Sequence, residues 1–352
     1  MNSNQSILFF SRGRGYGHAI PDLDIARELC ALRPDICISF VSYATGATVF
    51  RSAGVLFIDL LLREDAPFIE VLLACEKIIK LHKPAIILAH EEFSALVGAV
   101  IHGIPSILIS AWFPRNGTPA AEAVRYASSI IVIENPGIFE VPSGTRAPVH
   151  YVGPIIRTLS ATAADRQRVR KEMEIADDSF VILVVPGGAS SEERFPIAPI
   201  VFSAFSLFKR SVKSLIWLSN KDFDLLSASV NLSKDMRLLR YFEPIDHLLI
   251  SADVIITKGT RGITLDALSI GVPTISLSPG QNPIDDILVP RMPSNIALNA
   301  RAVDGAVLVH YIDQVAKRGR MRRGSFWSNA TVATAARLSQ EIDRILSHDP
   351  KQ

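Results

Sequence analysis

A glycine-rich segment near the N-terminus is the first place in this sequence where chemistry is expected. It reads SRGRGYGH over residues 11–18, between an apolar run that predicts a strand and a stretch that predicts a helix. Its glycines permit a tight turn and close backbone approach, and a helix N-terminus favours negative charge. We therefore predict an acceptor or phosphate loop. The residues of this loop are Gly13, Arg14, Gly15, Tyr16 and Gly17.

The spacing of these glycines argues against two common nucleotide-binding loops. The pattern is GxGxG rather than GxGxxG, and the second predicted strand, CISFVSY, ends without an acid that would hold an adenosine ribose. Nicotinamide chemistry is therefore disfavoured. No Gly-Lys-Ser/Thr follows the glycines, so the segment is not a Walker loop either.

Two candidate catalytic side chains follow predicted strands of the first half. His18 ends the glycine turn, where an imidazole can deprotonate a hydroxyl or orient a sugar phosphate. His90, Glu91 and Glu92 follow the strand at 86–88, and Glu91 is the candidate acid. The alternatives are a histidine that only hydrogen-bonds its turn and an acid pair that complements a helix dipole.

The second half contains two more glycine turns that suit a phosphate. VVPGGASS, at residues 184–191, offers backbone N–H groups and serine hydroxyls, although an ordinary tight turn has the same composition. Further on, Gly259 and Gly262 precede a helix whose first turn is predicted to carry Thr264 and Asp266. Such a helix would place phosphate at its N-terminus and ribose hydroxyls on the carboxylate.

Short β-rich runs alternate with amphipathic helical stretches, the pattern of parallel sheets covered by helices on both faces. The predicted fold class is α/β. The strands predicted in the first half are 7–10, 36–41, 55–58, 86–88, 107–109 and 130–133, and those in the second half are 180–185, 214–218, 254–256 and 274–277.

The chain is expected to form two similar lobes. Its 352 residues exceed the usual length of one domain, and the segments AIILAHEEFSALVGAVIHGIPSILIS and VIITKGTRGITLDALSIGVPTISLS share a strand, loop, helix, Gly-x-Pro turn and strand. We predict a Rossmann-like domain at 1–155 and a second at 156–328. Ligands of doubly wound sheets bind beyond the carboxyl ends of the strands, so two facing lobes would place an active cleft between them.

The amino-acid composition restricts the classes of protein to which this chain can belong. An apolar share of 48% indicates an extensively buried protein, and a net charge of +2 gives no field that points to nucleic acid. Cys30, Cys37 and Cys75 form neither a CxxC pair nor an even set, so we interpret them as reduced core residues of a cytoplasmic protein. The N-terminus lacks the basic region of a signal peptide.

A basic run near the C-terminus leaves peripheral contact with the inner face of a membrane open. Such a cluster can attract anionic lipid, although a solvated loop before the last helix is the more frequent explanation. No apolar run approaches the ~18 residues that cross a bilayer. The residues of the run are Lys317, Arg318, Arg320, Arg322 and Arg323, followed by Phe326 and Trp327.

Four segments together resemble the GT-B glycosyltransferases, particularly the family of the peptidoglycan N-acetylglucosaminyltransferase (glycosyltransferase family 28). They are GRGYGHAIPDLDIARELCAL, YVGPIIR, PGGASS and ADVIITKGTRGITLDALSIGVPTISL. The resemblance spans most of the chain, and the last segment is the most specific. It implies an acceptor domain followed by a donor domain, with a C-terminal helix at 329–352 that packs back on the first domain.

The resemblance assigns roles to individual residues. It places the ribose on Asp266, where the family more usually has Glu, the donor diphosphate on Arg157, and the base, usually uracil, at the backbone of Ile245. His18 matches the histidine of the family's first glycine loop. Gly188, Ala189 and Ser190 match the family's phosphate-contacting turn. The other residues predicted to bind the nucleotide sugar are Gly187, Gly259, Gly262 and Thr264, with Gln281 and Asn282 as candidates for contacts to the sugar.

Three departures from the family pattern bear on the acceptor and the sugar. Ile263 stands where the family usually has Thr, although the adjacent Thr264 can serve, and PGQNPIDD replaces the Gln-rich motif that contacts the donor sugar. The glutamate that the peptidoglycan enzyme carries in its first domain is replaced around Ala111 and Trp112.

The expected activity is inverting transfer from a nucleotide sugar, with UDP as the expected nucleotide, to a small-molecule, glycan or lipid-linked acceptor. Neither a metal ion nor a cofactor is expected. Two alternatives stay open. One is a UDP-sugar 2-epimerase on the same fold, and the other is a non-catalytic sugar-nucleotide-binding subunit of a membrane-associated transferase.

Overall fold

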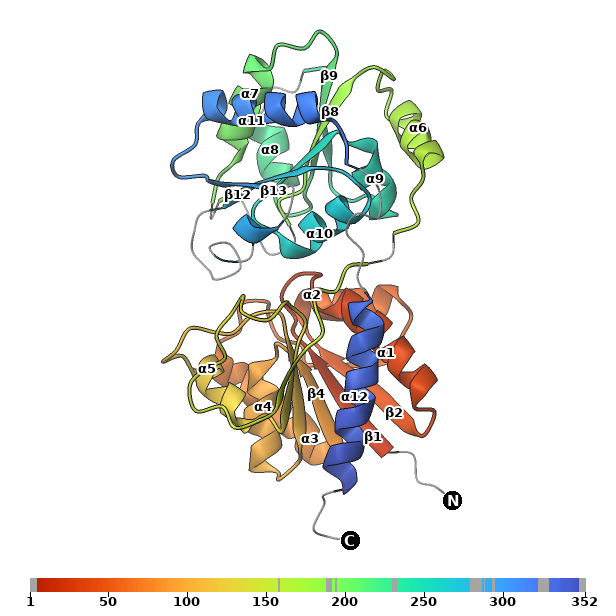
Figure 1. The fold of residues 1–352 in the computed structure, drawn as a ribbon, viewed down its shortest axis with the longest axis vertical. Coiled ribbons are helices and arrows are strands. Elements are labelled where there is room, and N and C mark those ends of the chain that lie inside the picture. Colours follow the sequence, from red (N-terminus) through yellow and green to blue (C-terminus); the bar gives the residue numbers. More distant parts are fainter. Residues whose placement is uncertain are drawn as a thin grey trace. The chain divides into compact units, whose positions relative to one another are not determined.

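The protein consists of two α/β units. The computed structural model describes residues 5–157, 159–187, 192–193, 195–229, 233–278, 287, 289–292, 295–321 and 329–347. Packing within the chain separates Met1–Ile155 together with Ser328–Gln352, here called the N-terminal domain, from Ile156–Trp327, the C-terminal domain. Each contains a parallel sheet with helices on both faces (Figure 1), which confirms the predicted fold class.

The sheet of the N-terminal domain has the strand order β3-β2-β1-β4-β5-β6-β7, and its described pairings are all parallel. The order reverses between β1 and β4, which is where doubly wound sheets bind ligands. The strands are β1 Gln5–Ser11, β2 Ile36–Ser42, β3 Phe57–Asp59, β4 Ile86–His90, β5 Ser106–Ser110, β6 Ser129–Val132 and β7 Val149–Tyr151.

Helices cover both faces of this sheet because its strands are apolar on both sides. Ile7 and Leu8 of β1, which point to opposite faces, are each 1% exposed. The helices are α1 Ala19–Leu32, α2 Ala44–Ser52, α3 Phe68–His82, α4 Phe93–Ile101, α5 Pro119–Ala123 and α12 Ala330–Ser347, with a 3₁₀ turn at Val124–Tyr126.

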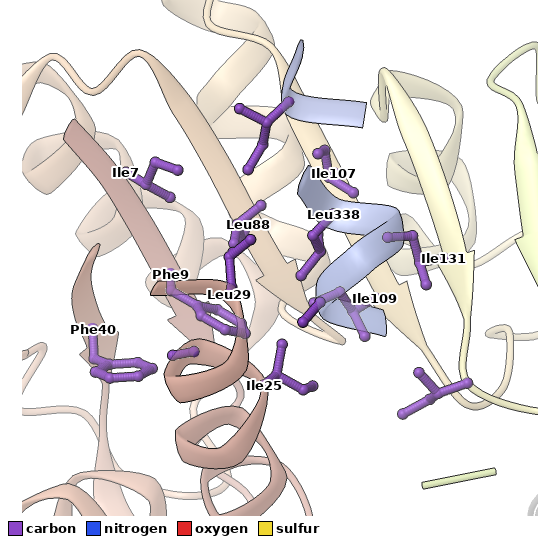
Figure 2. Packing of buried hydrophobic residues seen from close by; sticks show 14 of the residues in the cluster. Ile7, Phe9, Ile25, Leu29, Phe40, Leu88, Ile107, Ile109, Ile131 and Leu338 are labelled. Atoms are coloured by element: carbon purple, nitrogen blue, oxygen red, sulfur yellow. The ribbon is translucent and has the colours of Figure 1, made fainter. Parts of the chain in front are cut away.

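The C-terminal helix α12 completes the core of the N-terminal domain. Leu338 and Ile342 are fully buried and pack in one cluster with Ile25 and Leu29 of α1 and with Ile109 of β5. Figure 1 shows α12 beside α1 on the sheet, and Figure 2 shows Leu338 among strand residues of the cluster. The predicted return of the last helix to the first domain is therefore confirmed.

The sheet of the C-terminal domain has the order β10-β9-β8-β11-β12-β13. Its strands are β8 Phe180–Val184, β9 Lys213–Leu218, β10 Met236–Leu239, β11 Val254–Thr257, β12 Thr274–Ser278 and β13 Asn295–Asn299. Its helices are α6 Ala163–Glu172, α7 Ala198–Leu207, α8 Phe223–Ser229, α9 Ile245–Ser251, α10 Arg261–Ser269 and α11 Gly305–Arg318, with a 3₁₀ turn at Val289–Arg291. Two clusters of buried apolar side chains, one on each face, hold this sheet between its helices.

Asp253 pairs with two arginines at the amino-terminal end of the strands of this second sheet. Its carboxylate accepts hydrogen bonds from Arg166 Nη2 at 2.7 Å and Arg170 Nη2 at 2.8 Å, and from the Val181 backbone at 2.8 Å. Arg170, whose side chain is 3% exposed, also donates to the carbonyls of Ser251 and Ser179. The cluster holds α6 and the end of α9 against the start of β11, at the sheet edge opposite the predicted donor site.

Two predictions need correction in the light of the fold. Cys75 is buried as expected, but Cys30 and Cys37 are exposed, since Cys30 lies on the outer side of α1 and Cys37 at the start of β2. All three cysteines are free. Arg320 of the predicted basic run is half-buried, donates to the Ile250 carbonyl at 3.0 Å and has its pKa lowered by burial to about 10. The run positions 322, 323, 326 and 327 lie outside the described residues.

Candidate functional site

His18 and Glu91 form a hydrogen-bonded pair at the carboxyl edge of the first sheet. β1 and β4 are adjacent, and their register pairs Ser11 with His90, so the segments that follow both strands meet. His18 Nε2 lies 2.8 Å from Glu91 Oε2, and the two side chains are 16% and 4% exposed. The fold thus brings together the two candidate catalytic residues, which are 73 positions apart.

Backbone and side-chain donors fix the Glu91 carboxylate. The Ala111 backbone N–H donates to Oε1 at 3.0 Å, and the Trp112 indole donates to Oε2 at 2.7 Å. Arg12 Nη1 lies 3.8 Å from Oε2. Glu91 itself has a φ of +52°, a left-handed conformation that is costly for a residue with a side chain and recurs at functional sites.

The environment keeps Glu91 ionised. Burial raises its pKa, but the groups around the carboxylate, led by His18, outweigh burial and hold the pKa well below its ordinary range. The pKa of the neighbouring Glu92 is shifted in the opposite direction, because burial dominates there and raises it. Glu92 Oε2 accepts a hydrogen bond from Tyr43 at 3.1 Å. The pKa values of these two neighbouring acids are therefore shifted in opposite directions.

The orientation of the His18 ring follows from its two hydrogen-bond partners. Nε2 faces Glu91, and Nδ1 lies 3.3 Å from the carbonyl oxygen of Arg14. An ionised carboxylate can only accept, so Glu91 favours the tautomer with a proton on Nε2. Nδ1 then carries the lone pair. Once His18 gains a second proton, both N–H groups have an acceptor.

A second histidine–acid pair lies beside the first and was missed from the sequence. His90 Nδ1 lies 2.6 Å from Asp22 Oδ1, and these side chains are 2% and 0% exposed. The rings of His18 and His90 meet edge to face with centroids 5.0 Å apart. The available signal was the position of Asp22 on the apolar face of α1, where an acid needs a buried partner.

The predicted glycine loop already holds an anionic group of the chain itself. The Gly15 backbone N–H donates to Glu64 Oε1 at 3.0 Å, and Arg14 Nε donates to the Glu64 carbonyl at 2.9 Å. Gly15 has a φ of +66°, which glycine tolerates and other residues rarely adopt. Tyr16 is 44% exposed. The Gly15 amide of the loop is thus occupied by a carboxylate of the chain itself, and the binding of an acceptor or phosphate there stays a prediction.

Two glycines of this loop predict contrasting effects of alanine. A Cβ at Gly13 would lie 2.5 Å from the Tyr43 backbone oxygen, whereas a Cβ at Gly17 meets nothing within 4 Å. We expect Gly13→Ala to lower the free energy of unfolding by about 1–3 kcal/mol through overpacking. Gly17→Ala is the matched control and should stay within about 0.5 kcal/mol of wild type. Urea denaturation measures both, and equal stability of the two variants would refute the close packing at Gly13.

The two predicted glycine turns of the C-terminal domain contact each other. Gly187 follows β8, and Thr260 caps α10 after β11. Thr260 Oγ1 donates to the Pro186 carbonyl at 2.7 Å, and a Cβ at Gly187, whose φ is +103°, would lie 2.3 Å from that hydroxyl oxygen. Gly259 also has a positive φ, of +76°. The predicted contacts at Gly188, Ala189, Ser190, Gln281 and Asn282 lie outside the described residues.

Asp266 and Arg157 lie together, and Asp266 lies deeper in the helix than predicted. α10 begins at Arg261, so Thr264 is its fourth residue and Asp266 its sixth, and neither lies at the helix start. Thr264 is fully buried and donates its hydroxyl to the Thr260 carbonyl at 2.8 Å. Arg157 Nε donates to Asp266 Oδ2 at 2.9 Å, and the two side chains are 24% and 5% exposed.

Burial disfavours the ionised form of Asp266. Burial raises the pKa of this carboxyl, and the Arg157 guanidinium counteracts the rise without cancelling it. The Arg157 guanidinium donates to Oδ2 of this carboxylate. Gly262 lies on the same helix and has open space where a Cβ would stand, while Ile245, the first residue of α9, packs at the border of the core.

A buried lysine next to these turns was not found from the sequence. Lys258 follows β11, and its Nζ lies 2.6 Å from Glu192 Oε1, with side chains 1% and 3% exposed. Glu192 also accepts from the backbone N–H groups of Ile197 and Ala198 at the start of α7, at 2.9 and 2.7 Å. The pair joins the turn after β11 to the segment after β8, and a Lys in a Thr-Lys-Gly-Thr turn was the available signal.

Comparisons with known proteins identify the fold. No family model matches the chain. In sequence it is similar to an uncharacterised glycosyltransferase of Methanopyrus kandleri, with 25% identity over 215 residues, 58% of this chain. The match spans 59% of that relative's length.

Two solved structures align with nearly the whole chain. The calicheamicin glycosyltransferase has a TM-score of 0.61 at 16% identity and covers 98% of each chain. The UDP-GlcNAc 2-epimerase of Neisseria meningitidis, bound to UDP-GlcNAc, has a TM-score of 0.67 at 15% identity and covers 95% of this chain and 100% of its own. The fold is GT-B. Within the described residues, no helix combines the length and the apolar character that a bilayer span requires.

Proposed function

We propose that this protein is a glycosyltransferase that moves a sugar, with inversion and without a metal ion, from a nucleotide sugar to an acceptor hydroxyl. The expected donor is a UDP-sugar. The observation that carries the proposal is the His18–Glu91 pair, 2.8 Å apart at the carboxyl edge of the first sheet of a GT-B fold. The similarity to an uncharacterised glycosyltransferase supports the same class of reaction.

In the proposed reaction His18 is the general base. Glu91 accepts a hydrogen bond from Nε2–H of His18 and so holds the tautomer in which Nδ1 is basic. Nδ1 takes the proton of the acceptor hydroxyl as the acceptor oxygen forms a bond to C1 of the sugar. The bond between C1 and the phosphate oxygen breaks, and its electron pair leaves with the nucleoside diphosphate. The imidazolium that results is stabilised by Glu91 and by the Arg14 carbonyl.

The donor is proposed to bind the C-terminal domain. Arg157, the backbone at Gly187 and the N-terminus of α10 would stabilise the charge that develops on the diphosphate, the electrostatic effect that usually contributes most to catalysis. Asp266 would hold the ribose once Arg157 turns from the carboxylate to phosphate. On donor binding, Arg157 and Asp266 would thus give up their ion pair, and each would bind a different part of the donor.

The experiment that tests the donor is calorimetry with UDP and with UDP-, dTDP- and GDP-sugars. We expect UDP to bind the wild-type protein. We also expect UDP-sugars to raise the melting temperature of the protein, because a ligand that binds the native state stabilises that state. UDP-sugar should stay intact until a hydroxyl acceptor is added, apart from slow hydrolysis. A protein without affinity for any nucleotide would overturn the proposal.

The second candidate is a UDP-sugar 2-epimerase. It is favoured by the similarity to the Neisseria meningitidis epimerase, whose TM-score of 0.67 exceeds the 0.61 of the calicheamicin glycosyltransferase. Incubation with donor alone separates the two functions, because an epimerase needs no acceptor. Chromatography that shows the 2-epimer or its free sugar accumulating from donor alone would replace the transferase proposal with this one.

A further inference from the structure

We propose that His18, His90 and Glu91 form a binding site for a divalent transition-metal ion such as zinc(II). One nitrogen of each imidazole and one oxygen of the carboxylate all lie within 4.8 Å of one another. His18 follows β1, whereas His90 and Glu91 stand at the end of β4, so the site exists only in the folded sheet. We refer to these three residues as the His-His-Glu cluster.

The donor set of the His-His-Glu cluster matches the preferences of zinc. Two imidazoles and one carboxylate, at bond lengths of about 2.0–2.2 Å, leave a fourth position of a tetrahedron open for water or a substrate. His18 Nε2 and Glu91 Oε2 are already 2.8 Å apart. A bound ion would draw the third ligand atom inward from its place within 4.8 Å of the other two.

Each ligand of the His-His-Glu cluster is oriented by a second hydrogen bond. His90 Nδ1 lies 2.6 Å from Asp22 Oδ1, and His18 Nδ1 lies 3.3 Å from the Arg14 carbonyl, so the Nε2 atoms are the ligating nitrogens. The Ala111 backbone N–H holds Glu91 Oε1 at 3.0 Å. Histidine ligands of metals characteristically donate their other N–H to a carboxylate or a carbonyl in this way.

Charge and burial around the His-His-Glu cluster favour a cation on balance. Glu91 and Asp22 each bring a carboxylate, while Arg12, 3.8 Å from Glu91 Oε2, opposes a dication. The Arg12 side chain is 20% exposed, so its charge is partly hydrated. His90 is 2% and Glu91 4% exposed, whereas His18 is 16% exposed and leaves an entry path for the ion.

Metal binding would compete with the proposed catalytic role of His18. The ion would bond to His18 Nε2 and to Glu91 in place of their hydrogen bond. The imidazole proton would then stand on Nδ1, so His18 could no longer act as the base. Zinc is therefore expected to inhibit transfer and EDTA to leave transfer unimpaired. This inhibition rests on the proposed function, whereas the binding of the metal does not.

The test uses cobalt(II) as a spectroscopic probe on the full chain freed of metal with EDTA. We expect one equivalent of cobalt to give the visible absorption bands of a four- or five-coordinate site, and zinc to abolish them. His90→Gln removes a ligand and should weaken cobalt binding at least ~100-fold, while Asp22→Asn, which changes the outer partner, should weaken it roughly 10- to 100-fold.

His102→Gln is the matched control, because His102 forms a similar pair with Glu76, at 2.9 Å, on the more exposed surface of the same domain. It should bind cobalt like the wild type. Where circular dichroism shows that His90→Gln does not fold, the more exposed His18→Gln replaces it with the same expected loss. Absence of cobalt bands at millimolar metal, or unchanged binding in the folded ligand variant, overturns the metal site. Bound cobalt in a protein without transferase activity would retain the site and reject only its proposed effect on transfer.

Discussion

His18→Gln is expected to lower kcat for sugar transfer by roughly 10²–10⁴, the range over which a positioned general base contributes. The amide can still donate to Glu91, and the His18 side chain is 16% exposed, so the fold should persist. Affinity for UDP should change little, because the proposed donor residues lie in the C-terminal domain. Steady-state release of UDP measures kcat, and calorimetry measures donor affinity.

Glu91→Gln should lower kcat by a comparable factor, because its amide no longer favours the reactive tautomer of His18. The pKa of Glu91 in the folded protein lies below the ordinary value of 4.5, so the carboxylate that the variant lacks is ionised at all pH values above about 5. The loss should therefore be similar from pH 6 to 9. The matched control is His102→Gln, which should retain wild-type kcat. If His18→Gln transfers sugar at the wild-type rate, His18 is not the base.

Asp266→Ala is expected to weaken UDP binding by roughly 10- to 100-fold, the equivalent of one hydrogen bond to a charged group. The change also removes the partner of Arg157, so we expect the free energy of unfolding to fall by about 1–3 kcal/mol. Arg157, with 24% of its side chain exposed, can recover part of that loss by hydration. Calorimetry at a temperature where the variant is folded separates binding from stability.

Asp253→Ala is the control for Asp266→Ala. Asp253 is also paired with arginine, Arg166 and Arg170, but it precedes β11 at the amino edge of the sheet, whereas ligands bind at the carboxyl edge. We expect this variant to lose stability and to bind UDP as the wild type does. Equal UDP affinity of the Asp266→Ala variant and the wild type would show that the acid serves only as a buried ion-pair partner.

The central strands were predictable because their sequences are continuous apolar runs. Residues 180–184 read FVILV and are all buried, and the prediction of 180–185 for this strand was wrong by one residue. β7, β10 and β13 were not predicted. β7 and β13 are the last strands at one edge of their sheets and β10 at the other, and their residues are half-buried or exposed. Edge strands bury less, so their sequences carry a weaker hydrophobic signal.

The start of the helix that carries Asp266 is a second feature that the sequence did not predict correctly. The glycines at 259 and 262 suggested a helix that starts after them, but α10 starts at Arg261, with Thr260 as its cap and Gly262 as its second residue. Glycine at that position is tolerated near a helix end, so the pattern of glycines alone did not fix the first turn. Asp266 consequently occupies the second turn and pairs with Arg157 from the segment before α6.

The sequence by itself determined the alternation of strands and helices, the two-domain α/β class and the turns that carry polar residues, because periodicity and glycine placement are local properties. The tertiary structure decided which of these residues meet. It joined His18 to Glu91, His90 to Asp22 and Arg157 to Asp266 across separations of 73, 68 and 109 residues. These contacts depend on strand order and register, above all the pairing of Ser11 with His90, which arise from packing over the whole sheet.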